Sequence, residues 1–291
     1  MTAPVFQMRL ALVSLLMLLL GACSTVVHVP ARKGAGAALP GAANGEVNRT
    51  GVVSPGSVDD AVAGYARVLQ RHVNDHGEVD FAALRDDASN AGLGALESYV
   101  QAIAVTPLDA APTQQARLAH MINAYNALSM FNVVEAGIPQ THAGLNKVGF
   151  FIGRKLVVGQ QPMSLYSFEN EVIRPFTRKL GDPRVHFALN CLAVSCPVLP
   201  RQPFSAATLD AELERETRAF FARPQNWRVD HASASVWLNE ILSFYTEDFV
   251  PVPATSLIEY ANRYASTTAP AHYSVRFAPY DWTVANSRRV R

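Results

Sequence analysis

The sequence of 291 residues predicts an α+β fold that is mostly helical and carries a small sheet. Apolar residues recur at helical spacing in several long segments, whereas the strand-like segments are short. Helices outweigh strands, which favours an α+β arrangement over a doubly wound parallel sheet. With 49% apolar and 17% charged residues, the chain has enough apolar side chains to form a core.

The first 22 residues have the parts of a secretory signal peptide. Arg9 precedes an uncharged apolar run over residues 10–20. That run is shorter than the roughly 20 residues of a membrane-spanning helix. It ends in Leu-Gly-Ala-Cys at residues 20–23, which resembles the bacterial lipobox, where the Cys is lipidated and becomes the N-terminus. We therefore predict that Cys23 is lipidated; the alternative is an ordinary signal peptide followed by a chance Cys.

The segment after the signal peptide indicates how the protein is attached to the membrane. Residues 23–54 are rich in Ala, Gly, Val and Pro without helical periodicity, and we interpret them as a flexible tether. Residues 55–291 are predicted to form a single globular domain. Ser24, rather than Asp, follows the lipidated Cys, which favours an outer-membrane lipoprotein facing the periplasm. The membrane is then a partner through the N-terminal lipid, and the net charge of +1 argues against nucleic acid.

Apolar periodicity and turn residues predict the elements of the globular part. The longest helix has Pro112 in its first turn and Gly137 at its C-terminal stop. Helices are predicted over residues 57–73, 93–104, 112–136, 209–221, 241–249 and 257–264, with another beginning at Ser164. Strands are predicted as a hairpin over 148–158, a buried strand at 185–189, a pair at 227–229 and 235–238, and a last strand at 275–277.

Two cysteines follow the predicted buried strand. A thiol becomes a nucleophile as its thiolate, and a nearby His can take its proton, so Cys191 and His186 form a candidate pair. They lie five residues apart, and the chain must turn at Asn190 for them to meet. Three alternatives stay open: a disulfide between Cys191 and Cys196, two buried free cysteines, and a zinc site with His186, Cys191 and Cys196 as ligands.

Polar side chains also interrupt two predicted helices. Asn123, Tyr125 and Asn126 lie in the longest helix, where buried amides need hydrogen-bond partners. They either orient a site residue or bind a substrate amide. The alternative is that they form a hydrogen bond at the surface or between helices. Glu169 borders the buried face of the helix that begins at Ser164. A carboxylate there is costly unless it is paired, for example with Arg174 or a His.

Taken together, these segments resemble the domain of unknown function 547 family. The resemblance covers roughly residues 116–249, with a similar tail at Tyr-Asp-Trp 280–282. The segments that carry it occur in the family order: Ile-Asn-Ala-Tyr-Asn-Ala-Leu at 122–128, Ser-Leu-Tyr-Ser-Phe-Glu at 164–169 followed by Ile-Arg at 173–174, Asp-Pro-Arg-Val-His-Phe-Ala-Leu at 182–189, the Cys191 segment ending in Ser-Cys-Pro at 195–197, and Ser-Phe-Tyr at 243–245 followed by Asp-Phe at 248–249.

The resemblance implies a thiol-hydrolase-like domain with a triad of Glu, His and Cys. Carried over to this chain, the triad consists of Glu169, His186 and Cys191. Plant-like members often have Ser at the position of Cys196, which favours Cys191 as the reactive thiol. The chain departs from the family at Asn170, where many members have His.

These expectations define two functional hypotheses. The first is a cysteine-dependent hydrolase or acyltransferase of the bacterial envelope that acts on peptide or amide bonds, with a peptide or envelope protein as substrate. Cys191, with a depressed pKa, attacks; His186 is the base, and Glu169 orients it. Asn190 or a nearby backbone amide stabilises the oxyanion. The second hypothesis is a non-catalytic periplasmic binding or scaffolding lipoprotein that uses the same cleft. Neither hypothesis calls for a metal or another cofactor.

Overall fold

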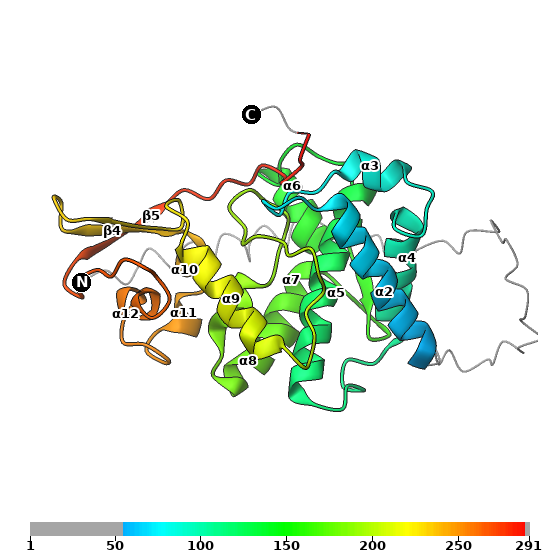
Figure 1. Ribbon diagram of the computed structural model, residues 1–291, viewed down its shortest axis with the longest axis horizontal. Helices are drawn as coiled ribbons and strands as arrows, with labels where there is room; N and C mark the ends of the chain where they lie inside the picture. The colour runs from blue at the N-terminus through cyan, green and yellow to red at the C-terminus, as the bar shows by residue number, and fades with distance from the viewer. Residues whose placement is uncertain (1–54, 289–291) are drawn as a thin grey trace, which may run out of the picture.

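The computed structural model describes residues 55–288 and shows a mostly helical α+β fold (Figure 1). This confirms the predicted α+β class, with two small sheets in place of one. The predicted signal peptide, the lipidated Cys23 and the tether all lie outside the described residues. Within residues 55–288, no helix has the length and apolar character needed to cross a membrane.

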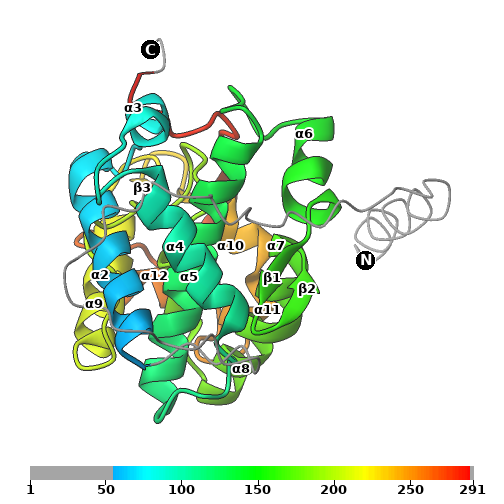
Figure 2. The same cartoon turned by 90° about the vertical axis from the view of Figure 1, so that its right-hand side faces the viewer.

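The centre of the fold is α5 (Gln114–Glu135), the longest helix that the structure describes. Sixteen of its 22 residues are buried, so it is surrounded on nearly all sides. Figure 2 shows α5 between α2 (Pro55–His72) and the β1–β2 hairpin. Thr113 caps its N-terminus by accepting a hydrogen bond from the Ala116 amide at 3.1 Å. The helix therefore begins just after the predicted position, and it brings polar residues into the interior.

The other helices surround α5. α4 (Leu93–Val105) packs between α2 and α5. The helix predicted from Ser164 is confirmed at its start but consists of three consecutive pieces, and the one predicted at 241–249 divides into α10 and α11. The bounds of the remaining helices are α3 (Phe81–Asp86), α6 (Leu145–Val148), α7 (Leu165–Ser167), α8 (Arg174–Leu180), α9 (Leu209–Phe221), α10 (Ile241–Phe244), α11 (Thr246–Phe249) and α12 (Leu257–Asn262), with the π-helical segments η1 (Gly149–Gly153) and η2 (Phe168–Ile173).

Both sheets are small. β1 (Leu156–Val158) and β2 (Gln161–Met163) form an antiparallel hairpin whose turn residues, Gly159 and Gln160, both have positive φ. The hairpin predicted over 148–158 is therefore displaced, because residues 149–153 are helical. In the second sheet, β3 (Trp227–Asp230) pairs antiparallel with β4 (Ser235–Asn239), as predicted, and β5 (Ser274–Ala278) runs parallel to β4.

The buried strand predicted at 185–189 is wrong, because the chain forms a 3₁₀-helix there, η3 (Pro183–Phe187). The Asp182 carboxylate accepts a hydrogen bond from the Arg184 amide at 3.1 Å, and Pro183 fits the first helical turn. A short apolar run does not distinguish a strand from a buried helical turn. His186 is therefore buried on a helical turn and does not begin a strand that leads to Cys191.

Two hydrophobic clusters meet near η3. The first is built around α2, α4 and α5 and includes both cysteines. The second contains aromatic residues of α9, α12 and the β3–β4 pair, and Phe187 of η3 belongs to it. Residues 280–287, called here the C-terminal segment, run from the end of β5 towards α3 (Figure 1). Isolated bridges join this segment to Val79, Thr141 and Ala193, so it ties distant parts of the chain together.

Candidate functional site

The two thiols lie side by side in a loop between η3 and α9. The Sγ atoms of Cys191 and Cys196 are 2.8 Å apart, and both residues are free and buried. The Tyr280 hydroxyl donates a hydrogen bond to Cys196 Sγ at 3.1 Å and lies 3.9 Å from Cys191 Sγ. The three side chains therefore form one hydrogen-bonded group, in which Cys196 receives the closer contact from Tyr280.

Asparagine side chains fix the shape of residues 190–197, the thiol loop. Asn190 donates to the Pro197 carbonyl at 2.6 Å and accepts from the Leu192 amide at 2.7 Å. This turn holds Leu192 at a φ of 63°, which a branched residue rarely adopts. Asn126 of α5 accepts from the Asn190 amide at 2.8 Å and donates to the Ala188 carbonyl at 3.0 Å. The buried amide at Asn126 thus holds the chain that leads into the thiol loop.

The C-terminal segment covers the other side of the thiol loop. The Val194 amide donates to the Thr283 carbonyl at 2.8 Å, and the Ser195 amide donates to the Asp281 carbonyl at 3.2 Å. The Asp281 amide in turn donates to Ser195 Oγ at 2.8 Å. These contacts fix the position of Tyr280, which the thiols need as a donor.

The two thiols differ in their readiness to ionise. Burial raises the pKa of Cys196, but hydrogen bonds from the Cys191 thiol, the Tyr280 hydroxyl and the Ala193 backbone outweigh burial and lower it. The pKa of Cys191 is raised well above its usual value, because its thiol donates to Cys196 and is itself buried. The expectation of a depressed pKa at Cys191 is therefore wrong. The negative charge is stabilised on Cys196, and Cys191 keeps its proton.

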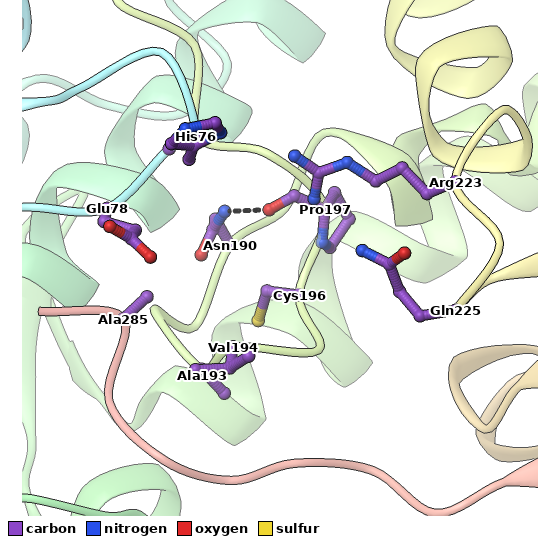
Figure 3. Close-up of a pocket in the computed structure, with 11 residues that line it drawn as sticks. His76, Glu78, Asn190, Ala193, Val194, Cys196, Pro197, Arg223, Gln225 and Ala285 are labelled. Carbon is purple, nitrogen blue, oxygen red and sulfur yellow. Dashed lines mark hydrogen bonds between the residues drawn. The ribbon is translucent and has the colours of Figure 1, made fainter. Parts of the chain in front are cut away.

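Cys196 also lines a cavity of about 470 Å³, whereas Cys191 is not among the residues that line it. Figure 3 shows Glu78 and Arg223 on opposite sides of this cavity, with Asn190 and Cys196 between them. Its volume lies in the range of small-ligand sites. A ligand in the cavity would meet Cys196 before it met Cys191.

Glu169, on the π-helical segment η2, is held by two tyrosines. It accepts a hydrogen bond from the Tyr125 hydroxyl at 2.8 Å and another from the Tyr245 hydroxyl. Burial raises the pKa of both tyrosines, and the Glu169 charge raises it further. Both hydroxyls therefore stay protonated and act as donors. Cys191 also lies near enough to both tyrosines to interact with them electrostatically, so Glu169 and the thiol loop are neighbours of the same two rings.

His186 pairs with a different carboxylate. Its Nε2 lies 2.8 Å from Asp248 Oδ2, and its ring stacks on Tyr245 with centroids 4.2 Å apart. The predicted hydrogen bond between Glu169 and His186 is not formed, because Tyr245 binds Glu169 through its hydroxyl and covers the imidazole with its ring. Among the described hydrogen bonds, none joins His186 to Cys191 or Cys196.

Two arginines complete the surroundings of Asp248. Arg174 donates to Asp248 Oδ2 at 2.7 Å, and Arg178 donates to the other oxygen. Burial raises the pKa of Asp248, but hydrogen bonds from His186 and Arg174 outweigh burial and hold it well below the usual range. The Arg174 guanidinium also lies 4.9 Å from the Tyr245 ring centroid. Its hydrogen bonds go to Asp248, Glu247 and Asn170, so Arg174 is not the partner of Glu169.

Comparison with known proteins places these residues in a family. Residues 110–221 match the family model described as "Protein of unknown function, DUF547". This stretch of the chain is similar to the DUF547 family. No curated protein and no solved structure matches the chain. The matched residues include Glu169, His186 and both thiols, whereas Tyr245, Asp248 and Tyr280 lie beyond them.

The remaining predicted site residues have distinct positions in the structure. Asn123 exchanges two hydrogen bonds of 2.8 Å with the backbone of Phe204, so it holds the chain after the thiol loop. The zinc alternative finds no support in the described part of the chain, which contains no cluster of three or more His, Cys, Asp or Glu side chains suited to a metal. Asn170 accepts a hydrogen bond from Arg174 at 2.6 Å.

The sequence did not single out several residues near the two thiols. Tyr245, Asp248 and Tyr280 were part of the segments that resemble the family, so a signal existed, but no role was assigned to them. Lys147 lies 3.8 Å above the Trp282 ring, and no pattern in the sequence indicated this contact. A last residue, His142, is fully buried, and burial lowers its pKa to about 4.

Proposed function

We propose that this protein is a cysteine-dependent hydrolase or acyltransferase of the bacterial envelope that acts on peptide or amide bonds through a thiol-hydrolase-like domain. One observation carries the proposal: at the wall of a cavity, Cys196 receives hydrogen bonds that favour its thiolate. A thiolate next to space for a ligand is the arrangement that nucleophilic catalysis needs.

The proposed nucleophile is Cys196, in place of the Cys191 predicted from sequence. Cys196 lines the cavity and has the lowered pKa, whereas Cys191 does not line it and has a raised pKa. Cys196 Sγ forms a bond to the substrate carbonyl carbon, and the carbon–nitrogen bond breaks. The amine leaves with the proton of the Cys191 thiol, which is in hydrogen-bond contact with Cys196. A thioester at Cys196 remains.

Release of the acyl group reverses the proton transfer. Water, or an acceptor amine or hydroxyl, attacks the thioester and gives its proton to the Cys191 thiolate, while Cys196 leaves as a thiolate. The raised pKa of Cys191 makes its thiolate a strong base for this step. The Asn190 amide lines the same cavity and has a second N–H besides the one bound to Pro197, so we assign it to the oxyanion.

Glu169 and His186 act as positioning residues in this proposal. Glu169 orients Tyr125 and Tyr245, and His186 supports the Tyr245 ring from the other side. Neither Glu169 nor His186 is required to touch the substrate. Their replacement is expected to change the rate through Tyr245, by less than the loss of Cys196.

An activated ester tests the nucleophile. With p-nitrophenyl acetate, the reduced protein should form a thioester at residue 196, identified by intact mass and peptide mapping. Cys196→Ser should abolish the adduct. Cys191→Ser is the matched control and should retain it, because nitrophenolate leaves without needing a proton. An acetyl group on Cys191, or no adduct in a folded protein, would contradict the assignment.

The non-catalytic binding alternative is favoured by a different observation. No described hydrogen bond joins an imidazole to either thiol, and His186 is committed to Asp248. A binding module would occupy the cavity without forming a thioester. This second function would be supported if a ligand bound in the cavity protected the thiols of a folded protein that never forms a thioester.

We also propose that the protein is an outer-membrane lipoprotein facing the periplasm, supported by the lipobox-like residues 20–23 and by Ser24. Cys23→Ala should move the protein from the membrane fraction to the soluble fraction and remove the mass of the acyl chains. A variant that stays in the membrane fraction with unchanged mass would contradict the proposal.

A further inference from the structure

The geometry of the two thiols suits chemistry that a hydrolase does not need. The Sγ atoms of Cys191 and Cys196 are already in contact at 2.8 Å, and only four residues separate them in the chain. A bond between the two sulfur atoms would therefore require only a small movement of the thiol loop. In acyl transfer the Cys191 thiol only passes on a proton, but at this distance it can also form a bond to Cys196.

The two thiols also differ in the way that exchange with a disulfide requires. Cys196 lines the cavity and receives the hydrogen bond from Tyr280, so it is the thiol that an incoming disulfide meets. Cys191 contacts Cys196 through its sulfur but does not line this cavity, so a ligand in the cavity meets Cys196 first. One thiol is thus placed for attack and the other for resolving the product of that attack.

The cavity lining includes a cation, Arg223, that forms no described ion pair. Arg223 follows α9, and among the described residues its guanidinium makes no hydrogen bond or ion pair. Burial lowers its pKa, and the charge of Glu216 only partly offsets this effect. Figure 3 shows Arg223 extending over the cavity near Pro197. A carboxylate on a ligand would supply the missing partner.

We propose that this protein carries out thiol–disulfide exchange between the Cys191–Cys196 pair and a carboxylate-bearing disulfide bound in the cavity. The Cys196 thiolate attacks one sulfur of the ligand, a Cys196–ligand disulfide forms, and the first ligand thiolate leaves. That thiolate takes a proton, and the Cys191 thiol gives one up. Cys191 then attacks Cys196 Sγ, which closes the Cys191–Cys196 disulfide and releases the second ligand thiolate. The ligand gains two electrons, and the pair loses two.

This activity shares the Cys196 thiolate with the proposed hydrolase but breaks a sulfur–sulfur bond instead of a carbon–nitrogen bond. It needs Cys191 for completion, whereas acylation by an activated ester does not. The two proposals can therefore fail separately, because thioester formation and disulfide exchange are measured on the same variants with different reagents.

Glutathione disulfide is a suitable probe, since it carries carboxylates. The reduced full-length protein is mixed with the probe near neutral pH, quenched with acid and measured by intact mass. The wild type should lose two hydrogens and release two glutathione thiols per chain. Cys191→Ser should stop after the first step and keep one glutathione at residue 196, whereas Cys196→Ser should react at least about tenfold more slowly.

The results that overturn the proposal are equally specific. If Cys191→Ser gains no glutathione while it remains folded, the exchange does not occur at Cys196. If Cys196→Ser gains glutathione as fast as Cys191→Ser, the assignment of attacking and resolving thiols is wrong. The wild-type reaction can be tested even if neither variant folds. In that case the loss of two hydrogens and the mapping of a Cys191–Cys196 disulfide are the readout, and the absence of this disulfide would overturn the proposal.

The role of Arg223 is tested with a second disulfide. Arg223→Gln should slow the reaction with glutathione disulfide severalfold and leave the reaction with uncharged bis(2-hydroxyethyl) disulfide unchanged. Arg228→Gln is the charge-matched control, since Arg228 is exposed on β3 outside the cavity lining. Equal slowing with both disulfides, or equal slowing in the control, would overturn carboxylate recognition by Arg223.

Discussion

Replacement of His142 by Phe should change how the stability of the protein depends on pH. His142 is fully buried and stacks on Phe150 with ring centroids 4.0 Å apart, and neither ring nitrogen forms a hydrogen bond of good geometry. Burial lowers its pKa to about 4, although the nearby Cys191 backbone offsets part of this shift. A Phe at this position keeps an aromatic ring against Phe150 and removes the titrating group.

The sign and size of the effect follow from the pKa of His142. Between a pH of roughly 6.5, where the imidazole of the unfolded chain titrates, and a pH of about 4, the unfolded state binds a proton that the folded state does not. The wild type therefore loses stability as the pH falls through this window. The gap in pKa corresponds to roughly 3 kcal/mol of stability that the wild type loses across this window and that His142→Phe should keep.

Urea unfolding at pH 7, 6, 5 and 4 measures the difference. The free energy of unfolding of the wild type minus that of His142→Phe should fall by roughly 3 kcal/mol from pH 7 to pH 4. Any packing penalty of Phe shifts this difference by a constant, and other titrating groups are present in both proteins and cancel. His272→Phe, at an exposed position, is the control. A difference that stays constant with pH in His142→Phe would refute the reasoning.

Three further predictions concern the site. Tyr280→Phe removes the donor to Cys196, so alkylation by iodoacetamide at pH 7 should slow about tenfold, as measured by mass. Asp248→Ala leaves the buried Arg174 guanidinium with the exposed Glu247 as its carboxylate partner and should lower the free energy of unfolding by about 3 kcal/mol in urea. Because the Asp248 carboxyl has a depressed pKa, this difference should shrink as the pH falls below about 4. Asn126→Ala and Asn123→Ala should each cost about 1–3 kcal/mol in urea, but only Asn126→Ala should change the alkylation rate.

Each of these predictions has a matched comparison. Tyr99→Phe removes a buried hydroxyl that makes no described hydrogen bond and should leave the alkylation rate unchanged. Asp248→Asn keeps part of the hydrogen bonding and should destabilise less than Asp248→Ala. An alkylation rate that responds equally to Asn123→Ala and Asn126→Ala would show that general destabilisation, not support of the thiol loop, controls the thiol.

Much of the fold was predictable because its signals are local. The apolar stripe with Pro112 and Gly137 at its ends located α5 to within two residues, and the pairing of β3 with β4 was also predicted. Residues 185–189 were mispredicted as a strand, because a short apolar-rich segment fits either structure. Its Asp-Pro start was the local signal that favoured a helical turn.

The arrangement of the site depends on contacts between distant parts of the chain. Asp248 lies 62 residues from His186, and no spacing rule distinguishes it from Glu169 as the imidazole's partner. The choice between Cys191 and Cys196 likewise depends on Tyr280 and on which thiol reaches the cavity. The sequence could identify the reactive segment, but the thiol that carries the charge is decided by tertiary structure.

The C-terminal segment has a consequence for the newly made chain. Tyr280 lies 84 residues after Cys196, which corresponds to roughly 4–17 s of synthesis at common ribosome speeds. Throughout that interval both thiols lack the Tyr280 hydroxyl and the backbone of the C-terminal segment, which later determine how readily each thiol ionises. A nascent chain, or one that ends near residue 221, therefore carries the cysteines of the site without the surroundings that make them different from each other. The difference between the two thiols is completed only when Tyr280 has been made, so a chain that stops before it holds two thiols that lack this difference.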